Sequence, residues 1–186
     1  MWEVDMRPFD SYPKDEHELR SPPRNPYNCR HGWGLDIQQR TGQTRCAYCG
    51  VSLVDDYYHW LLMCVDHVVP SREAQRLNIP PDLANGLVNH VLACSGCNGF
   101  HNRHVIAAEP QKEWTLDQFI DLRDTTFRNR KASVGERRAE EMAFFDRHPW
   151  NQPKLTIISE DSRHHPECQA QGTRHRDSEG RLTTKS

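Results

Sequence analysis

Two C-x-x-C pairs constrain the fold of this chain more than any other feature of its sequence. The pairs are Cys46-Ala-Tyr-Cys49 and Cys94-Ser-Gly-Cys97. A C-x-x-C turn brings two thiolates to one ion, and two such turns complete the tetrahedral four-sulfur site typical of structural zinc. Gly50 follows the first pair, where a tight turn favours glycine. The spacing therefore predicts a structural Zn²⁺ site made by Cys46, Cys49, Cys94 and Cys97.

The alternatives for these pairs are redox dithiols, or buried thiols that pack as small hydrophobic groups. The chain has 7 Cys in 186 residues, and an odd count without a recognisable signal peptide argues against a disulfide framework. Cys29, Cys64 and Cys168 have no spacing partner, so we expect ordinary reduced thiols there. No apolar run approaches the roughly 20 residues that span a bilayer. These features predict a cytoplasmic protein in a reducing compartment, with no membrane partner.

The charge balance does not identify a partner by itself. Lys and Arg number 24 against 26 Asp and Glu, so no global field attracts a polyanion. A local basic face can still contact phosphates, and residues 123–138 hold six basic residues against two acidic ones. The alternative is a solvated helix face. The candidate nucleic-acid contacts in this stretch are Arg128, Arg130, Lys131, Arg137 and Arg138.

The distribution of turn and apolar residues divides the chain into four parts. Residues 1–28 are rich in proline and predict an extended arm, and residues 29–108 contain the cysteine pairs and form the core. Within that core we expect strands near 51–69 and 86–93 and helices near 71–77 and 98–108. Residues 109–158 predict a helical extension with two amphipathic helices, beginning at Thr115 and Ser133, and an edge strand at 155–158. Residues 159–186 have almost nothing to bury and predict a disordered tail.

A second set of residues lies between and beside the cysteine pairs. The run Asp66-His67-Val68-Val69-Pro70 follows the first pair, Asn89 precedes Cys94 by five positions, and Asn98 directly follows Cys97. From Cys46 to about His104, this order and spacing resembles the HNH endonuclease family. The resemblance implies an α+β fold: a small zinc-stabilised ββα-metal core, similar to a treble clef, with C-terminal helices and flexible ends.

The residue types suit the hydrolysis of a phosphodiester. That reaction needs a base to activate water and a cation to offset the charge that develops on phosphate. An imidazole such as His67 titrates near pH 6.5, and the oxygens of Asp66 and Asn98 suit Mg²⁺ or Mn²⁺. The resemblance implies that His67 is the general base, that Asp66 and Asn98 hold the metal, and that Asn89 hydrogen-bonds the loop that orients His67. It also implies DNA cleavage, as a nick or a double-strand break, that leaves 5′-phosphate and 3′-hydroxyl ends.

Two departures from the family pattern are visible. Relatives often carry Lys three positions after the last Asn, where this chain has His101. His101 is a candidate third metal ligand or phosphate contact, and otherwise an exposed helix histidine. The segment from His67 to Asn89 is long, and it is either an insertion that shapes substrate access or a plain loop.

Other interpretations of the same residues stay open. Singly, Asp66 can cap a turn, His67 can be a satisfied core histidine and Asn98 can be a helix N-cap. One alternative function is a zinc-containing module that binds nucleic acid or protein without cutting. Another is the nuclease subunit of a larger complex, since nothing here resembles a sequence-reading module and a targeting protein would supply specificity. RNA is also open as a substrate.

Overall fold

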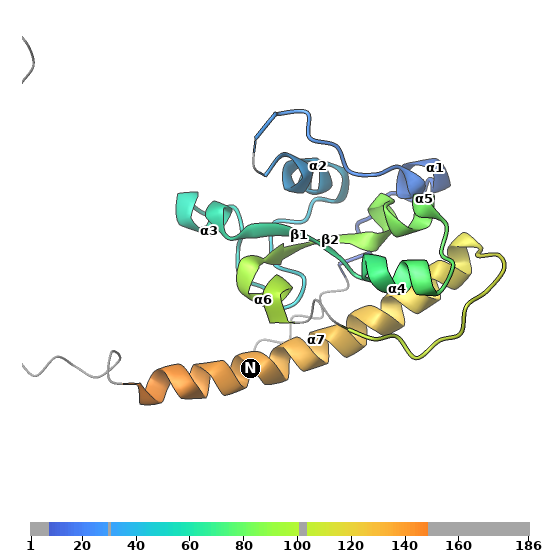
Figure 1. Ribbon diagram of the computed structural model, residues 1–186. Coiled ribbons are helices and arrows are strands. Elements are labelled where there is room, and N and C mark those ends of the chain that lie inside the picture. Colours follow the sequence, from blue (N-terminus) through green and yellow to red (C-terminus); the bar gives the residue numbers. More distant parts are fainter. Residues whose placement is uncertain (1–7, 30, 101–103, 149–186) are drawn as a thin grey trace, which may run out of the picture. The chain divides into compact units, whose positions relative to one another are not determined.

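A two-stranded antiparallel hairpin lies at the centre of the fold (Figure 1). In this computed structural model, which describes residues 8–29, 31–100 and 104–148, strand β1 (Met63–His67) pairs with β2 (His90–Cys94). The register sets Met63 opposite Cys94 and His67 opposite His90. Because side chains alternate along a strand, Asp66 and His67 face opposite sides of the hairpin.

Helices surround the hairpin and make the fold mixed α and β, as the sequence predicts (Figure 1). Gly34 of one helix packs on Met63 of β1, and Arg130 of another contacts the end of the same strand. The helices are α1 (Glu16–Arg20), α2 (Gly32–Thr41), α3 (Tyr57–Leu61), α4 (Ser71–Arg76), α5 (Pro81–Ala84), α6 (Ser95–Phe100) and α7 (Leu116–Arg147), with a 3-10 turn η1 (Leu87–Asn89).

The first strand is shorter than the sequence predicts. Asp56 caps α3 by accepting a hydrogen bond from the amide of His59 at 2.9 Å, which starts a helical turn where we expected a strand. Tyr57 and Tyr58 in that turn are exposed, so the aromatic run does not pack as a strand. Strand β1 therefore begins only at Met63.

The N-terminal segment is part of the fold rather than an extended arm, which corrects the expectation for residues 8–28. Tyr12 is buried, and its hydroxyl donates to the carbonyl of His90 in β2. The Gln43 amide donates to the Tyr12 hydroxyl at 3.2 Å and to the Pro8 carbonyl at 3.0 Å. Leu19 adds a buried apolar contact. The proline-rich segment is therefore packed against the hairpin through Tyr12 and Leu19.

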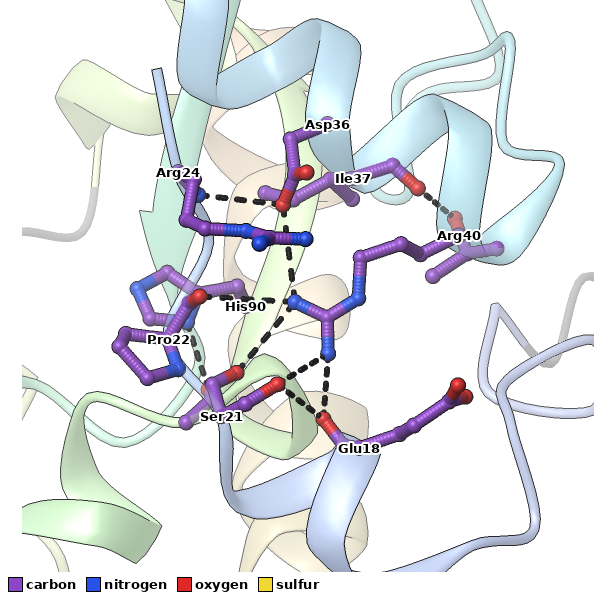
Figure 2. Close-up of polar contacts among 10 residues, drawn as sticks. Glu18, Ser21, Pro22, Arg24, Asp36, Ile37, Arg40 and His90 are labelled. Atoms are coloured by element: carbon purple, nitrogen blue, oxygen red, sulfur yellow. Dashed lines mark hydrogen bonds and ion pairs between the residues drawn. The ribbon is translucent and has the colours of Figure 1, made fainter. Parts of the chain in front are cut away.

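Arg40 ties this N-terminal segment to α2. Figure 2 shows its guanidinium reaching the carbonyls of Glu18, Ser21 and Pro22 while it lies 3.5 Å from the carboxylate of Asp36. Arg40 thus adds a donor to the Glu18 carbonyl, which also accepts from the Ser21 amide, and to the Ser21 carbonyl, which also accepts from the Leu87 amide. The contact fixes residues 18–22 beside the start of β2.

The segment between His67 and Asn89 is not a plain loop. It folds into α4, α5 and η1, and its leucines Leu77, Leu83 and Leu87 are fully buried. The carboxylate of Glu73 in α4 is buried as well, and it accepts a hydrogen bond from the amide of Ile106 at 3.0 Å. The segment is thereby fixed to the chain that leads into α7.

Helix α7 is one continuous helix where the sequence predicts two. It starts at Thr115, as expected, where Thr115 and Gln118 form a capping box. Ser133 lies inside the helix and does not begin a new one. The next residue, Val134, is buried, and this packing favours a helix that continues through both residues. Helix α6 ends at Phe100, so the helix predicted over 98–108 is also wrong in its second half; residues 104–108 lie outside any helix.

Residues 109–148 belong to the same compact unit as the hairpin, so the boundary expected near residue 109 does not separate two units. The predicted edge strand at 155–158 and the predicted tail at 159–186 lie outside the described residues. Within the described ranges, no helix has both the length and the apolar character to cross a membrane.

Candidate active site and metal centre

Four cysteines converge at one end of the hairpin, as the sequence predicts. The sulfur atoms of Cys46, Cys49, Cys94 and Cys97 all lie within 4.8 Å of one another. Gly50 has a φ of 74°, and its amide closes the first turn onto the Cys46 carbonyl at 2.8 Å. The second pair spans the end of β2 and the start of α6. The cluster is suited to a metal ion such as zinc.

The four thiols shift one another's pKa in opposite directions. Hydrogen bonding with Cys46 lowers the pKa of Cys49 and lowers that of Cys94 to about 6, whereas hydrogen bonding raises the pKa of Cys46, mainly through Cys49, and that of Cys97, mainly through Cys46. Arg138 of α7 donates to the Cys97 sulfur at 3.6 Å. Four thiolates around Zn²⁺ carry a net charge of about −2, and the Arg138 guanidinium offsets part of it.

On one side of the hairpin, Asp66 meets an arginine and a tyrosine. Nη2 of Arg130 lies 2.9 Å from Oδ2 of Asp66 and 3.2 Å from Oδ1, and the Tyr48 hydroxyl donates to Oδ2. Burial, followed by the neighbouring Asp66 carboxylate, raises the pKa of Tyr48 well above its usual value, so the tyrosine stays a donor. Nη1 of the same arginine donates to the carbonyls of His67 at 2.6 Å and Val68 at 2.9 Å.

On the other side of the hairpin, His67 meets His90. Their Nε2 atoms are 3.0 Å apart, and Nδ1 of His90 lies 2.7 Å from the carbonyl of Gly86. A side chain on Gly86 would collide with the carbonyls of Asp82 and Leu19, which is why glycine fits there. Burial lowers the pKa of His67, and the Arg130 charge lowers it further while Asp66 opposes both.

Asn89 braces the backbone directly after His67. Its side-chain oxygen accepts from the amide of Val69 at 2.8 Å, and its side-chain nitrogen donates to the carbonyls of Val69 at 2.9 Å and Ala84 at 2.8 Å. The Asn89 carbonyl also accepts from the amide of Val68 at 2.9 Å. The side chain is fully buried, so these bonds have no competition from water.

Three of the predicted site residues meet at one small cavity. Asp66 and His67 leave the hairpin on opposite sides, but both stand at the end of β1, where the two residues and Asn98 line a space of about 280 Å³ together with Ser71 and Arg130. A larger neighbouring cavity of about 520 Å³ is also lined by His67 and Asn98, and by His90 and the half-exposed ring of Trp33. His101, the remaining candidate, lies outside the described residues.

Of the two Asp66 carboxylate oxygens at the small cavity, only Oδ1 is open to a hard divalent cation. Oδ2 of Asp66 accepts from both Tyr48 and Arg130, while Oδ1 accepts only from Arg130 and keeps a lone pair. Asn98, whose side chain carries an amide oxygen, lines the same cavity. The guanidinium of Arg130 offsets the charge of the Asp66 carboxylate.

The basic residues of α7 do not share one exposed face. The structure corrects the expectation for Arg130, whose guanidinium is 1% exposed and committed to Asp66 and two carbonyls. Arg138 turns toward the cysteines, and Arg137 pairs with Glu140 at 3.1 Å. Arg128 is exposed, and the half-buried Lys131 lies over the ring of Phe127.

Sequence reasoning missed the roles of Tyr48, His90 and Arg130. A signal for His90 was available: if the strands that end at His67 and begin after Asn89 pair antiparallel, the two histidines fall opposite each other. No comparable signal pairs Arg130 with Asp66, because 64 residues separate them and only the packing of α7 joins them.

Comparison of the chain with protein-family models, with curated proteins and with solved structures found no match to any of them.

Proposed function

We propose that this protein is a metal-dependent endonuclease of the HNH type that hydrolyses DNA phosphodiester bonds. The observation that carries the proposal is the meeting of Asp66, His67 and Asn98 at one cavity, beside a hairpin whose far end holds four clustered cysteines. These are the base and the oxygen ligands that phosphodiester hydrolysis requires. Zn²⁺ at the cysteines would stabilise the short hairpin and α6.

His67 is the proposed general base. His67 is partly buried and lines two cavities, which would admit the attacking water and a phosphate. Burial holds its pKa below the ordinary value of 6.5, and the ring is therefore mostly neutral at pH 7. A neutral imidazole can accept a proton from the attacking water. Asn89 and Arg130 hold the backbone directly after this ring, at Val69 and at the His67 carbonyl.

Asp66 and Asn98 are the proposed ligands of the catalytic cation. Mg²⁺ or Mn²⁺, when bound, supplies charge stabilisation for the phosphate and the departing oxygen. Asp66 would bind through Oδ1, the oxygen that Tyr48 leaves open, and Asn98 through its amide oxygen. Arg130 keeps the carboxylate fixed while it neutralises the site before substrate arrives.

DNA is the proposed substrate, with 5′-phosphate and 3′-hydroxyl products. Arg130 at the site is buried in its ion pair with Asp66, and the whole chain carries a net charge of −2. A long duplex would thus gain little electrostatic affinity from this chain alone. This balance supports a nuclease subunit that a larger partner targets to its DNA.

A non-catalytic binding module is the second candidate, and one observation favours it. Arg130 already occupies most of the hydrogen-bonding capacity of the Asp66 carboxylate, as expected for an aspartate with a purely structural role. In that case Asp66 and Arg130 only join α7 to the hairpin, and the zinc-supported surface binds nucleic acid or protein without cutting it.

A labelled-oligonucleotide experiment separates the two candidates. Zinc-loaded protein and its His67→Ala variant are incubated with single- and double-stranded DNA in Mg²⁺ or Mn²⁺, and bound and cleaved fractions are both measured. The nuclease requires shortened strands with 5′-phosphate ends from the wild type, and at least a hundredfold slower cleavage by the variant. Retarded but intact DNA with both proteins identifies a binding module.

A further inference from the structure

The hydrogen bond between His67 and His90 has a donor and an acceptor, and the proposed nuclease function does not depend on which histidine is which. Two imidazole nitrogens 3.0 Å apart form a hydrogen bond only when one carries a proton and the other a lone pair. The second nitrogen of His90 lies 2.7 Å from the Gly86 carbonyl. A carbonyl can only accept, so Nδ1 of His90 must carry the proton of that bond.

The protonation of His90 then determines that of His67. A neutral imidazole has one N–H, and when Nδ1 of His90 holds it, Nε2 of His90 is an acceptor. Nε2 of His67 must therefore donate. If His67 is also neutral, its Nδ1 is left with a lone pair, and no hydrogen bond among the described residues reaches that atom.

We infer that His90 is a positioning residue that holds His67 as the Nε2–H tautomer and leaves Nδ1 as the basic nitrogen. The inference rests on the proposed function for the role of His67, although the tautomer itself can be tested without any activity. During the reaction Nδ1 of His67 would accept the proton of water, while Nε2 keeps its proton and its bond to His90. His90 itself neither gains nor loses a proton.

The surroundings of His90 support its role as a neutral acceptor. It is buried, and its backbone carbonyl is fixed by the Tyr12 hydroxyl. The Arg40 charge also disfavours a positive charge on His90 and lowers its pKa; Figure 2 draws both side chains. The charges nearest His67 are Asp66 and Arg130, which are paired with each other. A protonated His90 would therefore be poorly stabilised.

The position opposite His67 needs an acceptor at the end of a side chain, and this suggests two matched variants. In His90→Gln an amide oxygen can take the place of the Nε2 lone pair. In His90→Leu a side chain of similar size offers no acceptor. If His90 only fills space, the two variants should behave alike; if it orients His67, they should differ.

The test is nuclear magnetic resonance of the full, zinc-loaded chain with ¹⁵N-labelled histidine at pH 7.5, assigned with His67→Ala. We expect a proton on Nε2 of His67 and on Nδ1 of His90, and an N–N coupling across the hydrogen bond between their Nε2 atoms. In His90→Leu, His67 should exchange between tautomers, whereas in His90→Gln it should stay in the Nε2–H form. Circular dichroism confirms that both variants fold.

The inference is overturned if wild-type His67 carries its proton on Nδ1, or if its tautomer is the same in both variants. It is also overturned if both Nε2 atoms lack protons and shift on addition of Zn²⁺, because the pair would then chelate a metal. Where cleavage is measurable, kcat should fall about tenfold in His90→Leu with KM little changed, and should recover in His90→Gln. An inactive wild type with the expected tautomers would contradict the nuclease but not the orientation of His67.

Discussion

The buried guanidinium of Arg130 lies 2.9 Å from the buried carboxylate of Asp66 and joins the middle of α7 to the end of β1. The same guanidinium holds the carbonyls of His67 and Val68. A single side chain of the C-terminal helix therefore sets both the charge at Asp66 and the backbone position at His67. This arrangement makes α7 part of the candidate site rather than an appendage to it.

Replacing Arg130 should destabilise the whole fold. Arg130→Met leaves the Asp66 carboxylate buried without its cation, which is expected to lower the free energy of unfolding by about 3–5 kcal/mol. Urea denaturation of the zinc-loaded protein measures it. Arg128→Met, on an exposed position of the same helix, is the matched control and should change stability by no more than about 0.5 kcal/mol. Equal effects of the two substitutions would show that the ion pair is not structural.

The four-cysteine cluster should bind one zinc ion per chain, because its sulfur atoms form a single group. Cys94→Ser should lose that zinc and unfold at a lower temperature or fail to fold, since a structural site contributes about 10–16 kcal/mol of apparent binding energy. Elemental analysis and thermal unfolding measure the two effects. Cys29→Ser, outside the cluster, should keep both zinc and stability. Full zinc content in Cys94→Ser would contradict the assignment.

The side-chain hydrogen bonds of Asn89 should contribute to the free energy of unfolding. Asn89→Ala removes both donors and the acceptor, and we expect it to lower the free energy of unfolding by about 2–4 kcal/mol. Chemical denaturation measures the loss. Asn129→Ala, at an exposed position of α7, serves as the control. A loss below 1 kcal/mol for Asn89→Ala would mean that the segment after β1 keeps its conformation without these bonds.

Acid should destabilise the protein partly through His90. Burial lowers its pKa to about 4, so between about pH 6.5 and pH 4 the unfolded chain binds a proton that the folded chain does not. The stability contributed by neutral His90 is thus complete above pH 6.5 and falls with pH across that interval, by about 3 kcal/mol in total. Urea denaturation of the wild type and of His90→Leu at pH 7.5 and 5.0 measures the part of this loss that falls above pH 5, about 2 kcal/mol.

The variant isolates the contribution of His90 from the loss of zinc in acid, because both proteins share the cysteine cluster. His90→Leu should lose less stability than the wild type over the same pH interval. Identical pH dependence in the two proteins would show that His90 does not titrate as its burial requires.

The sequence predicts the parts of this fold that depend on short-range spacing. The two C-x-x-C turns, the helix after Pro70 and the capping box at Thr115 are each determined within a few residues, and the structure contains them. The meeting of Asp66, His67 and Asn98 also follows from a hairpin and helix in the expected order.

The features that could not be predicted depend on packing between distant segments. The aromatic run at 57–61 has the composition of a strand, yet the Asp56 cap and the solvent around Tyr57 and Tyr58 allow a helix. From the sequence alone, a charged residue such as Arg130 is expected at the surface. Its burial depends on the buried Asp66 carboxylate, which only the packing of α7 brings next to it. Tyr12 lies in a proline-rich segment whose packing depends on the carbonyl of His90.

The most direct test of the proposed nuclease is the conversion of supercoiled plasmid by zinc-loaded protein in Mg²⁺, in Mn²⁺ and in EDTA. His67→Ala is the test variant, and His59→Ala in α3, outside the two cavities that His67 lines, is the control. We predict nicked or linear DNA from the wild type and His59→Ala in either metal, none in EDTA, and at least a hundredfold loss in His67→Ala. Intact plasmid with folded wild-type protein, or equal cleavage by His67→Ala, would contradict the account.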